Sequence, residues 1–104
     1  MITVITAFKL PKPITRDDAR RIFLSTAPKY QGVAGLVRKC YVLSEDGSTA
    51  GGIYLWNSRS EADAMYTESW KVFVREKYNT EPSVTYFDTP VVVDNVTNEI
   101  LSDE

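Results

Sequence analysis

Hydrophobic and polar positions change their period along the chain in a way that predicts alternating strands and helices. Residues 2–9 are rich in β-branched and apolar side chains, which is typical of a strand. Apolar residues then recur at helical spacing, so a helix is expected from about Arg16 to Ala27. Thr15 and Asp18 resemble a capping box and mark the start of this helix.

A β-hairpin is predicted around Asp46-Gly47, a dipeptide typical of two-residue type I′ turns. Strands are expected over 35–43 and 53–56. The turn sets a register that pairs Val37 with Trp56, Lys39 with Tyr54 and Tyr41 with Gly52. Because side chains alternate along a strand, one face of the hairpin carries Val37, Lys39, Tyr41, Tyr54 and Trp56, and the other carries Arg38, Cys40, Val42, Ile53 and Leu55.

A second helical region is predicted from Glu61 to about Tyr78. Ser60 and Asp63 mark its start, and a break is expected near Thr67. One side of this region carries a stripe with the spacing of a buried helical face, made by Tyr66, Trp70, Phe73, Val74 and Lys77.

The last predicted strand covers 83–93 and is interrupted by Pro90. The resulting order, βαββαβ, is that of an α+β ferredoxin-like domain with a four-stranded antiparallel sheet and its helices on one face. We expect this domain to occupy residues 1–95 and a polar, solvated tail to occupy 96–104. The face that the helices leave uncovered is apolar, whether it carries Cys40, Val42, Ile53 and Leu55 or the aromatic set, and this favours a homodimer formed by a second copy of the chain.

Such a dimer would place Arg38 and Cys40 at the interface between the subunits. Arg38 then needs a carboxylate partner, expected from the final strand of the other subunit. Cys40 is expected to be a small buried hydrophobic residue rather than a reactive thiol.

The composition narrows the possible functions. The chain has 104 residues, enough for one domain. Its net charge of −2 gives no basic surface for nucleic acid, and no apolar run approaches the ~20 residues that span a bilayer. With a single cysteine and no signal-like N-terminus, the protein is expected to be cytoplasmic.

The chain contains no histidine. Catalytic triads, Cys-His pairs and histidine-ligated metal or haem sites are therefore excluded, because each requires an imidazole. Any acid–base chemistry depends on Lys, Arg, Tyr, Asp or Glu. Aromatic residues are plentiful at 12% of the chain, and they favour a pocket for a planar ligand.

The hairpin carries a specific similarity to a known family. Its Asp46-Gly47 turn is followed by the segment Gly51-Gly52-Ile53-Tyr54-Leu55-Trp56, and the closing stretch reads Pro90-Val91-Val92-Val93-Asp94-Asn95. On these residues the chain resembles the YdhR-type mono-oxygenases of the dimeric α+β barrel superfamily. This resemblance implies two sheets packed face to face and a pocket in each subunit between sheet and helices. Relatives include cofactor-free oxygenases, haem-degrading enzymes, isomerases and dehydratases.

The predicted site centres on a lysine in mid-strand opposite a tyrosine. Lys39 and Tyr54 are the candidate catalytic residues, since burial would lower the pKa of the amine and make it a proton acceptor. Candidate substrate-binding residues are Val37, Tyr41, Trp56, Tyr66, Trp70 and Phe73. The alternative is structural: a lysine whose stem covers the core while its amine reaches solvent, surrounded by ordinary packing rings.

The leading functional hypothesis is an oxidoreductase, a cofactor-independent mono-oxygenase that acts on a planar phenolic, quinol or anthrone-like molecule. In such a reaction the deprotonated substrate supplies the electrons, so no bound cofactor is expected. Two alternatives stay open. The same groups could serve an isomerase, cyclase or dehydratase, or the dimer could bind a ligand without turnover.

Overall fold

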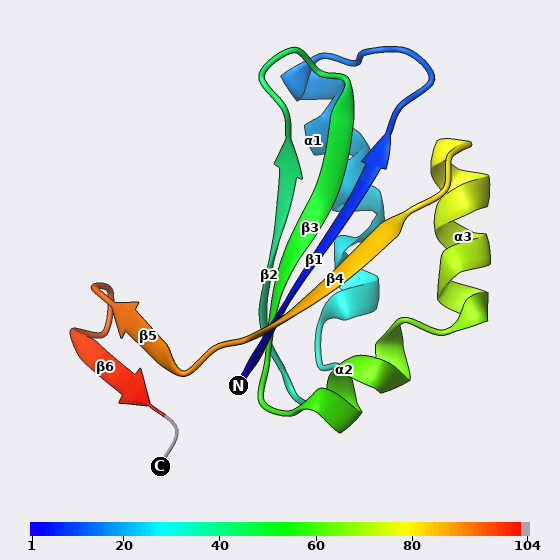
Figure 1. The fold of residues 1–104 in the computed structure, drawn as a ribbon. Helices are drawn as coiled ribbons and strands as arrows, with labels where there is room; N and C mark the ends of the chain where they lie inside the picture. Colours follow the sequence, from blue (N-terminus) through cyan, green and yellow to red (C-terminus); the bar gives the residue numbers. More distant parts are fainter. Residues whose placement is uncertain (103–104) are drawn as a thin grey trace.

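The computed structural model describes residues 1–102, and it has the predicted α+β architecture (Figure 1). The antiparallel four-stranded sheet has the order β2-β3-β1-β4, with strands β1 (Ile2–Lys9), β2 (Leu36–Leu43), β3 (Thr49–Trp56) and β4 (Ser83–Asp88). The helices are α1 (Arg16–Thr26), the short 3₁₀ helix η1 (Ala27–Tyr30), α2 (Arg59–Met65) and α3 (Glu68–Tyr78). They lie on one face of the sheet, which confirms the ferredoxin-like prediction.

Helix starts follow local capping chemistry. Thr15 caps α1 by accepting the Asp18 N–H, as predicted. The start of α2 was predicted at Ser60 and Glu61, but Ser58 caps the helix and accepts the Glu61 N–H. Glu61 supports this cap, since the Ser58 hydroxyl also donates to the Glu61 carboxylate.

The predicted break in the second helical region is present. Thr67 separates α2 from α3 and caps α3 by accepting the Trp70 N–H. At its other end α3 stops at Asn79, which adopts a left-handed conformation with φ 55°. This break lets the two short helices run in different directions across the sheet (Figure 1).

The hairpin register is confirmed over most of its length, with Lys39 opposite Tyr54 and Tyr41 opposite Gly52. The prediction that Val37 faces Trp56 is wrong. A bulge between Leu36 and Arg38 shifts the register by one residue, so that Leu36 faces Trp56 and Val37 is exposed.

The turn itself is not the predicted two-residue type I′ turn. Its loop spans 45–48, since Ser44 pairs with Thr49, and among the turn residues only Gly47 has a positive φ. A type I′ turn needs positive φ at both central residues. The Asp46 carboxylate instead accepts hydrogen bonds from the Ser48 N–H and from both serine hydroxyls of the loop, which holds this wider turn.

The chain after β4 forms a projecting arm rather than a plain tail. Strands β5 (Val91–Asp94) and β6 (Glu99–Ser102) pair into a hairpin that extends away from the body (Figure 1). Glu99, expected in a solvated tail, is therefore part of a strand. Asp103 and Glu104 lie outside the described residues.

The arm supplies the partner of Arg38. The Arg38 guanidinium donates to the Asp94 carboxylate at 3.2 Å, within the same chain. The prediction of a partner from another subunit is thus wrong for this ion pair. It failed because no local pattern indicated that the chain after β4 would bring Asp94 within reach of Arg38 in the same chain.

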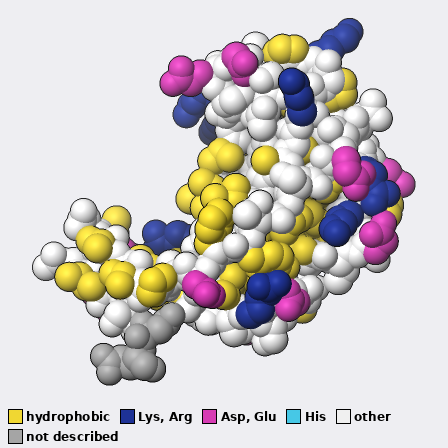
Figure 2. Space-filling model, in the orientation of Figure 1, with side chains coloured by type: hydrophobic (Ala, Val, Ile, Leu, Met, Phe, Trp, Pro, Cys, Tyr) yellow, Lys and Arg dark blue, Asp and Glu magenta, His cyan; other side chains and the backbone are white. Residues whose placement is uncertain are grey.

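The two faces of the sheet differ in burial. Under the helices lies the core, whose most completely buried side chains are Val4, Thr6, Tyr54 and Trp56. The opposite face is uncovered, and Figure 2 shows hydrophobic side chains gathered there and on the arm. Cys40, predicted to be buried, is exposed on this face in the single chain. Within residues 1–102, no helix has the length and apolar character needed to cross a bilayer.

Candidate active site

Lys39 is placed under the helices by its row in the sheet. The cross-strand row runs Lys39–Tyr54–Val4–Tyr86, and its other members pack in or against the hydrophobic core. Because β2 is an edge strand, Lys39 stands at the border of this covered face. Its long apolar stem can follow the core while its amine stays close to the rim.

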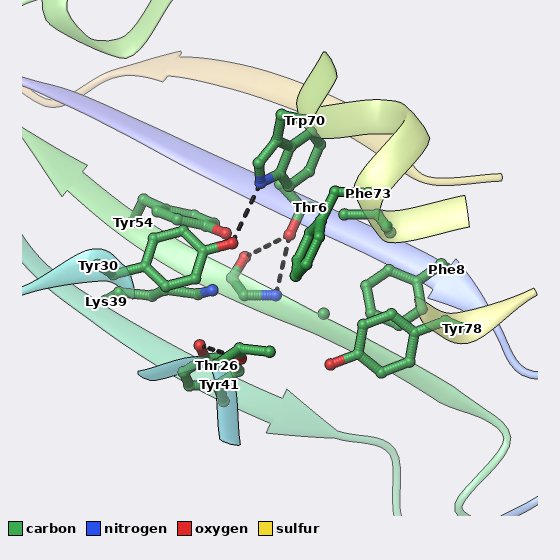
Figure 3. Close-up of a pocket in the computed structure, with 13 residues that line it drawn as sticks. Thr6, Phe8, Thr26, Tyr30, Lys39, Tyr41, Tyr54, Trp70, Phe73 and Tyr78 are labelled. Atoms are coloured by element: carbon green, nitrogen blue, oxygen red, sulfur yellow. Dashed lines mark hydrogen bonds between the residues drawn. The ribbon is translucent and has the colours of Figure 1, made fainter. Parts of the chain in front are cut away.

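The Lys39 amine is surrounded by aromatic faces. Its Nζ lies 3.4 Å from the ring centroid of Tyr30, 3.8 Å from that of Tyr41 and 4.8 Å from that of Tyr54. Figure 3 shows the amine ending beside the Tyr30 ring. Within the described chain, Nζ forms no ion pair and no hydrogen bond. Three ring faces thus take the place of a carboxylate partner.

This setting changes the proton affinity of Lys39. Burial, with a smaller repulsion from Lys29, lowers the pKa of the amine from 10.5 to about 7. The ring faces attract the ammonium form and act in the opposite direction. At neutral pH the amine is therefore divided between its charged and neutral forms, as a general base requires.

A glycine makes room for the lysine stem. A Cβ at Gly52 would lie 3.1 Å from Lys39 Cε and 2.9 Å from Tyr54 Cε1. Both distances are shorter than ordinary van der Waals contact. The Gly52 N–H in turn donates to the Thr6 hydroxyl at 3.0 Å, which holds β1 and β3 in place below the amine (Figure 3). The glycine pair noted in the sequence thus serves close packing at this site.

Tyr54 is near Lys39, but the amine contacts its ring face and not its hydroxyl. The side chain is 1% exposed. Burial is the main cause that raises the pKa of Tyr54 far above its usual value, and the neighbouring Tyr30 and Tyr66 raise it further. Tyr54 therefore remains a neutral phenol at any physiological pH.

The ring of Tyr41 lies between Lys39 and Phe23 of α1. Its ring stacks on Phe23 of α1 with centroids 4.8 Å apart, and its hydroxyl lies 2.7 Å from that of Thr26. Lys39 contacts the same ring. Burial raises the pKa of Tyr41, so it too is a neutral phenol at neutral pH.

Two hollows meet at Lys39. The first, which we call the lysine cavity, measures about 20 Å³, room for roughly one water molecule. The second, the η1–β2 groove, measures about 280 Å³ and is lined by Ala27, Tyr30, Gln31, Gly32, Leu36, Val37, Arg38, Lys39 and Tyr41. A ligand with an aromatic ring fits the groove and not the lysine cavity.

The predicted binding residues fall into three groups. Tyr41, Trp70 and Phe73 line the lysine cavity together with Lys39 and Tyr54. Val37 lines the η1–β2 groove instead. Trp56 and Tyr66 line neither hollow: the Trp56 indole donates to the Tyr66 hydroxyl at 3.0 Å, and both side chains are buried behind Tyr54.

Sequence reasoning missed several cavity residues, namely Thr6, Phe8, Thr26, Tyr30 and Tyr78. The most important is Tyr30, whose ring is nearest to the amine and whose hydroxyl accepts a hydrogen bond from the Trp70 indole at 3.2 Å. It lies in the 3₁₀ turn after Pro28, where no periodic pattern exists. Only its aromatic character could have marked it.

Around Lys39 the site offers aromatic rings, hydroxyls and one amine, and the η1–β2 groove adds the side chains of Gln31 and Arg38. Within residues 1–102, no three His, Cys, Asp or Glu side chains come together as a metal site. Flat aromatic walls with few polar groups suit a planar organic molecule, and Lys39 can accept a proton from it or hold its anionic oxygen.

Comparison with known proteins identifies the class of fold. Neither a protein-family model nor a curated protein sequence matches the chain. Solved structures do match. An antibiotic biosynthesis monooxygenase shares 18% identity with a TM-score of 0.64, over 86% of this chain and 98% of that one.

Two Streptomyces enzymes have the same fold. The monooxygenase ActVA-Orf6 of Streptomyces coelicolor, in complex with nanaomycin D, matches with a TM-score of 0.65 and 14% identity over 85% of this chain and 86% of its own. SnoaB, a cofactor-independent oxygenase from Streptomyces nogalater, matches with a TM-score of 0.61 and 14% identity over 85% and 91%. The chain thus has the ferredoxin-like fold of antibiotic biosynthesis monooxygenases. The YdhR-type resemblance stays a prediction.

Proposed function

We propose that the chain is a small cofactor-independent mono-oxygenase of a planar phenolic, quinol or anthrone-like substrate, and that it acts in the cytoplasm. The observation that carries this proposal is the Lys39 amine, whose lowered pKa and ring-lined surroundings provide a base next to an aromatic binding surface. The fold shared with SnoaB and ActVA-Orf6 supports the same chemistry.

The substrate would bind in the η1–β2 groove, because the lysine cavity is too small for an aromatic ring. Val37, Tyr41 and Lys39 line this groove and would contact the substrate. Neutral Lys39 would take a proton from the substrate, and the faces of Tyr30 and Tyr41 would stabilise the ammonium so formed. Trp70 and Phe73 would support these rings from α3.

Once deprotonated, the substrate is electron-rich enough to reduce dioxygen directly. For an anthrone, the CH₂ group becomes a carbonyl: one oxygen atom enters the product and the other leaves as water. Both electron pairs come from the substrate, so the protein has to bind, orient and deprotonate it and to exclude solvent. Tyr54, buried and held neutral, would act in this scheme only by packing beside Lys39.

The test is oxygen consumption by the purified protein with a panel of anthrones, hydroquinones and naphthols. We expect turnover of at least one class, with a rate that rises with pH through about 7 as Lys39 loses its proton. Lys39→Met should abolish turnover, whereas Lys12→Met, far from the site in sequence and exposed, should not.

Product mass separates the alternatives. Oxygenation adds oxygen to the product, whereas an isomerase, cyclase or dehydratase adds none. Tight binding of an aromatic compound without turnover would show a ligand-binding protein instead. Either of these results, or full activity in Lys39→Met, contradicts the proposed reaction.

We further propose that the functional unit is a homodimer formed through the open sheet face. Ile5, Ile53 and Phe87 are 37%, 40% and 49% exposed on this face of the single chain. The projecting arm adds a second apolar surface, with Val93 and Ile100 at 64% and 74% exposure. A second copy would cover both surfaces at once, and it would also bury Cys40.

A further inference from the structure

A third and larger hollow lies between α1 and the edge strand β2. This α1–β2 groove measures about 550 Å³, within the range of roughly 300–1,000 Å³ typical of small-molecule sites. It is lined by Ile14, Thr15, Arg16, Ala19, Arg20, Phe23, Leu24, Tyr41, Leu43, Ser44, Glu45 and Asp46. Of these residues only Tyr41 also lines the lysine cavity.

Two arginines on the helix wall of this groove, Arg16 and Arg20, form no ion pair or hydrogen bond with any of residues 1–102. The other four arginines, Arg21, Arg38, Arg59 and Arg75, are all paired with carboxylates. Among the described residues, the two guanidinium groups without a carboxylate partner therefore both lie at this groove.

The positive charges of Arg16 and Arg20 destabilise helix α1. Arg16 and Arg20 are four residues apart on α1, a spacing at which like charges repel. Arg16 is also the first residue of the helix, where the helix dipole disfavours a cation. A bound anion would relieve both effects, and the planar guanidinium is well suited to a carboxylate.

Next to the arginines the groove is apolar. Phe23 and Tyr41 form a stacked pair along it, and Leu24 is 55% exposed at its border. Buried Ala19 leaves space between Arg16 and Phe23 because its side chain is small. An apolar ring could lie against these side chains while its polar group reaches the arginines.

The opposite wall carries the acidic residues of the β2–β3 turn. Asp46 is occupied by the turn itself, since its carboxylate accepts hydrogen bonds from Ser44 and Ser48. Glu45 stands beside it at the rim. The groove thus has a basic helix side and an acidic turn side, which would orient an anionic ligand towards α1.

We propose that the α1–β2 groove is a binding site for a small aromatic carboxylate, with the ring against Phe23 and Tyr41 and the carboxylate at Arg16 and Arg20. This site is separate from the Lys39 site and meets it only through the ring of Tyr41. It does not depend on the proposed oxygenase reaction, because binding is measured without turnover.

The test uses 2-naphthoate and its neutral analogue 2-naphthalenemethanol as probes, with binding followed by calorimetry and by backbone amide NMR shifts. We expect 2-naphthoate to shift signals of α1 and of residues 43–46. The double variant Arg16→Gln/Arg20→Gln should weaken 2-naphthoate at least tenfold and leave the neutral probe within twofold. Both arginines are exposed, so the variant should fold normally.

Two single variants complete the design. Arg21→Gln is the matched control, because Arg21 lies on the same helix but pairs with Asp18 and does not line the groove; its affinity for 2-naphthoate should match the wild type. Phe23→Leu should weaken both probes by removing the stacking ring. The proposal is overturned if 2-naphthoate does not bind, if its shifts map to another surface, or if the double variant binds it as well as the wild type.

Discussion

The two faces of the sheet come from the same strands yet differ in kind. On the covered face, the row through Lys39 and Tyr54 carries long polar-tipped side chains packed under helices. One residue along, the row through Cys40 and Ile53 carries smaller side chains that the single chain leaves exposed. The strand period of two thus separates a face that is buried under the helices from an apolar face that the single chain leaves open.

The two faces also differ in how they solvate and pair a cationic side chain. On the covered face the side chain of Lys39 is partly buried, and this burial lowers the pKa of its amine to about 7. On the open face, Arg38 keeps solvent contact and pairs with Asp94, whose pKa is lowered chiefly by backbone hydrogen bonds from the arm. Of the two cations only the lysine could act as a base, because burial lowers the pKa of an amine whereas a guanidinium stays protonated in proteins.

The largest expected effect on stability comes from removing a large side chain from the covered face. Trp56→Ala removes a fully buried indole and its hydrogen bond to Tyr66, and it should lower the free energy of unfolding by about 3–5 kcal/mol. Val42→Ala on the open face should cost less than about 1.6 kcal/mol, even if a partner covers it, since it removes two methyl groups. Urea denaturation measures both. Equal costs would mean that the two faces do not differ as described.

A charge on the open face should separate the copies. Ile53→Asp places a carboxylate in the middle of this face, and we expect the dimer dissociation constant to rise at least a hundredfold, or about 2.7 kcal/mol. Sedimentation equilibrium measures this constant. Ala64→Asp, exposed on α2, is the control and should leave it unchanged. A wild-type protein that stays monomeric at high concentration would refute the homodimer.

The smallest effect tests the lysine itself. Because the pKa of Lys39 is about 7 in the folded protein and 10.5 as its ordinary value, the unfolded chain holds a proton that the folded one has lost between these limits. Stability should therefore rise from pH 7 to pH 9, by at most about 1.4 kcal/mol per pH unit.

Unfolding free energies of Lys39→Met and Lys12→Met sharpen this measurement. The first variant should lose the rise with pH, and the second should keep it. If the free energy of unfolding of the wild type does not change over this pH range, the amine is not desolvated. Lys39 would then be a structural lysine whose amine reaches solvent.

Much of the fold follows from short-range signals in the sequence. The Thr15 cap, the break at Thr67 and the pairing of Lys39 with Tyr54 were predicted because capping and strand alternation act over a few residues. The predictions failed where the local sequence is compatible with two structures. Ser58 and Ser60 could both cap α2, and an Asp-Gly pair allows more than one turn.

The site could be predicted only in part, because strand alternation and helical spacing place some of its residues and not the others. Alternation alone brought Lys39, Tyr41 and Tyr54 to one face, and the helical stripe brought Trp70 and Phe73 towards them.

Local patterns were thus enough to predict the order of the elements from β1 to β4, the division of the strand residues into two faces, and the grouping of Lys39 with tyrosine rings on one of these faces. They did not predict which face the helices cover, that Tyr30 lies nearest to the amine, that Val37 turns outward at a bulge, or that Arg16 and Arg20 border a groove. These outcomes depend on contacts between segments far apart in the chain. Such contacts are selected by how volumes and charges fit together in three dimensions, which no local pattern of residues specifies.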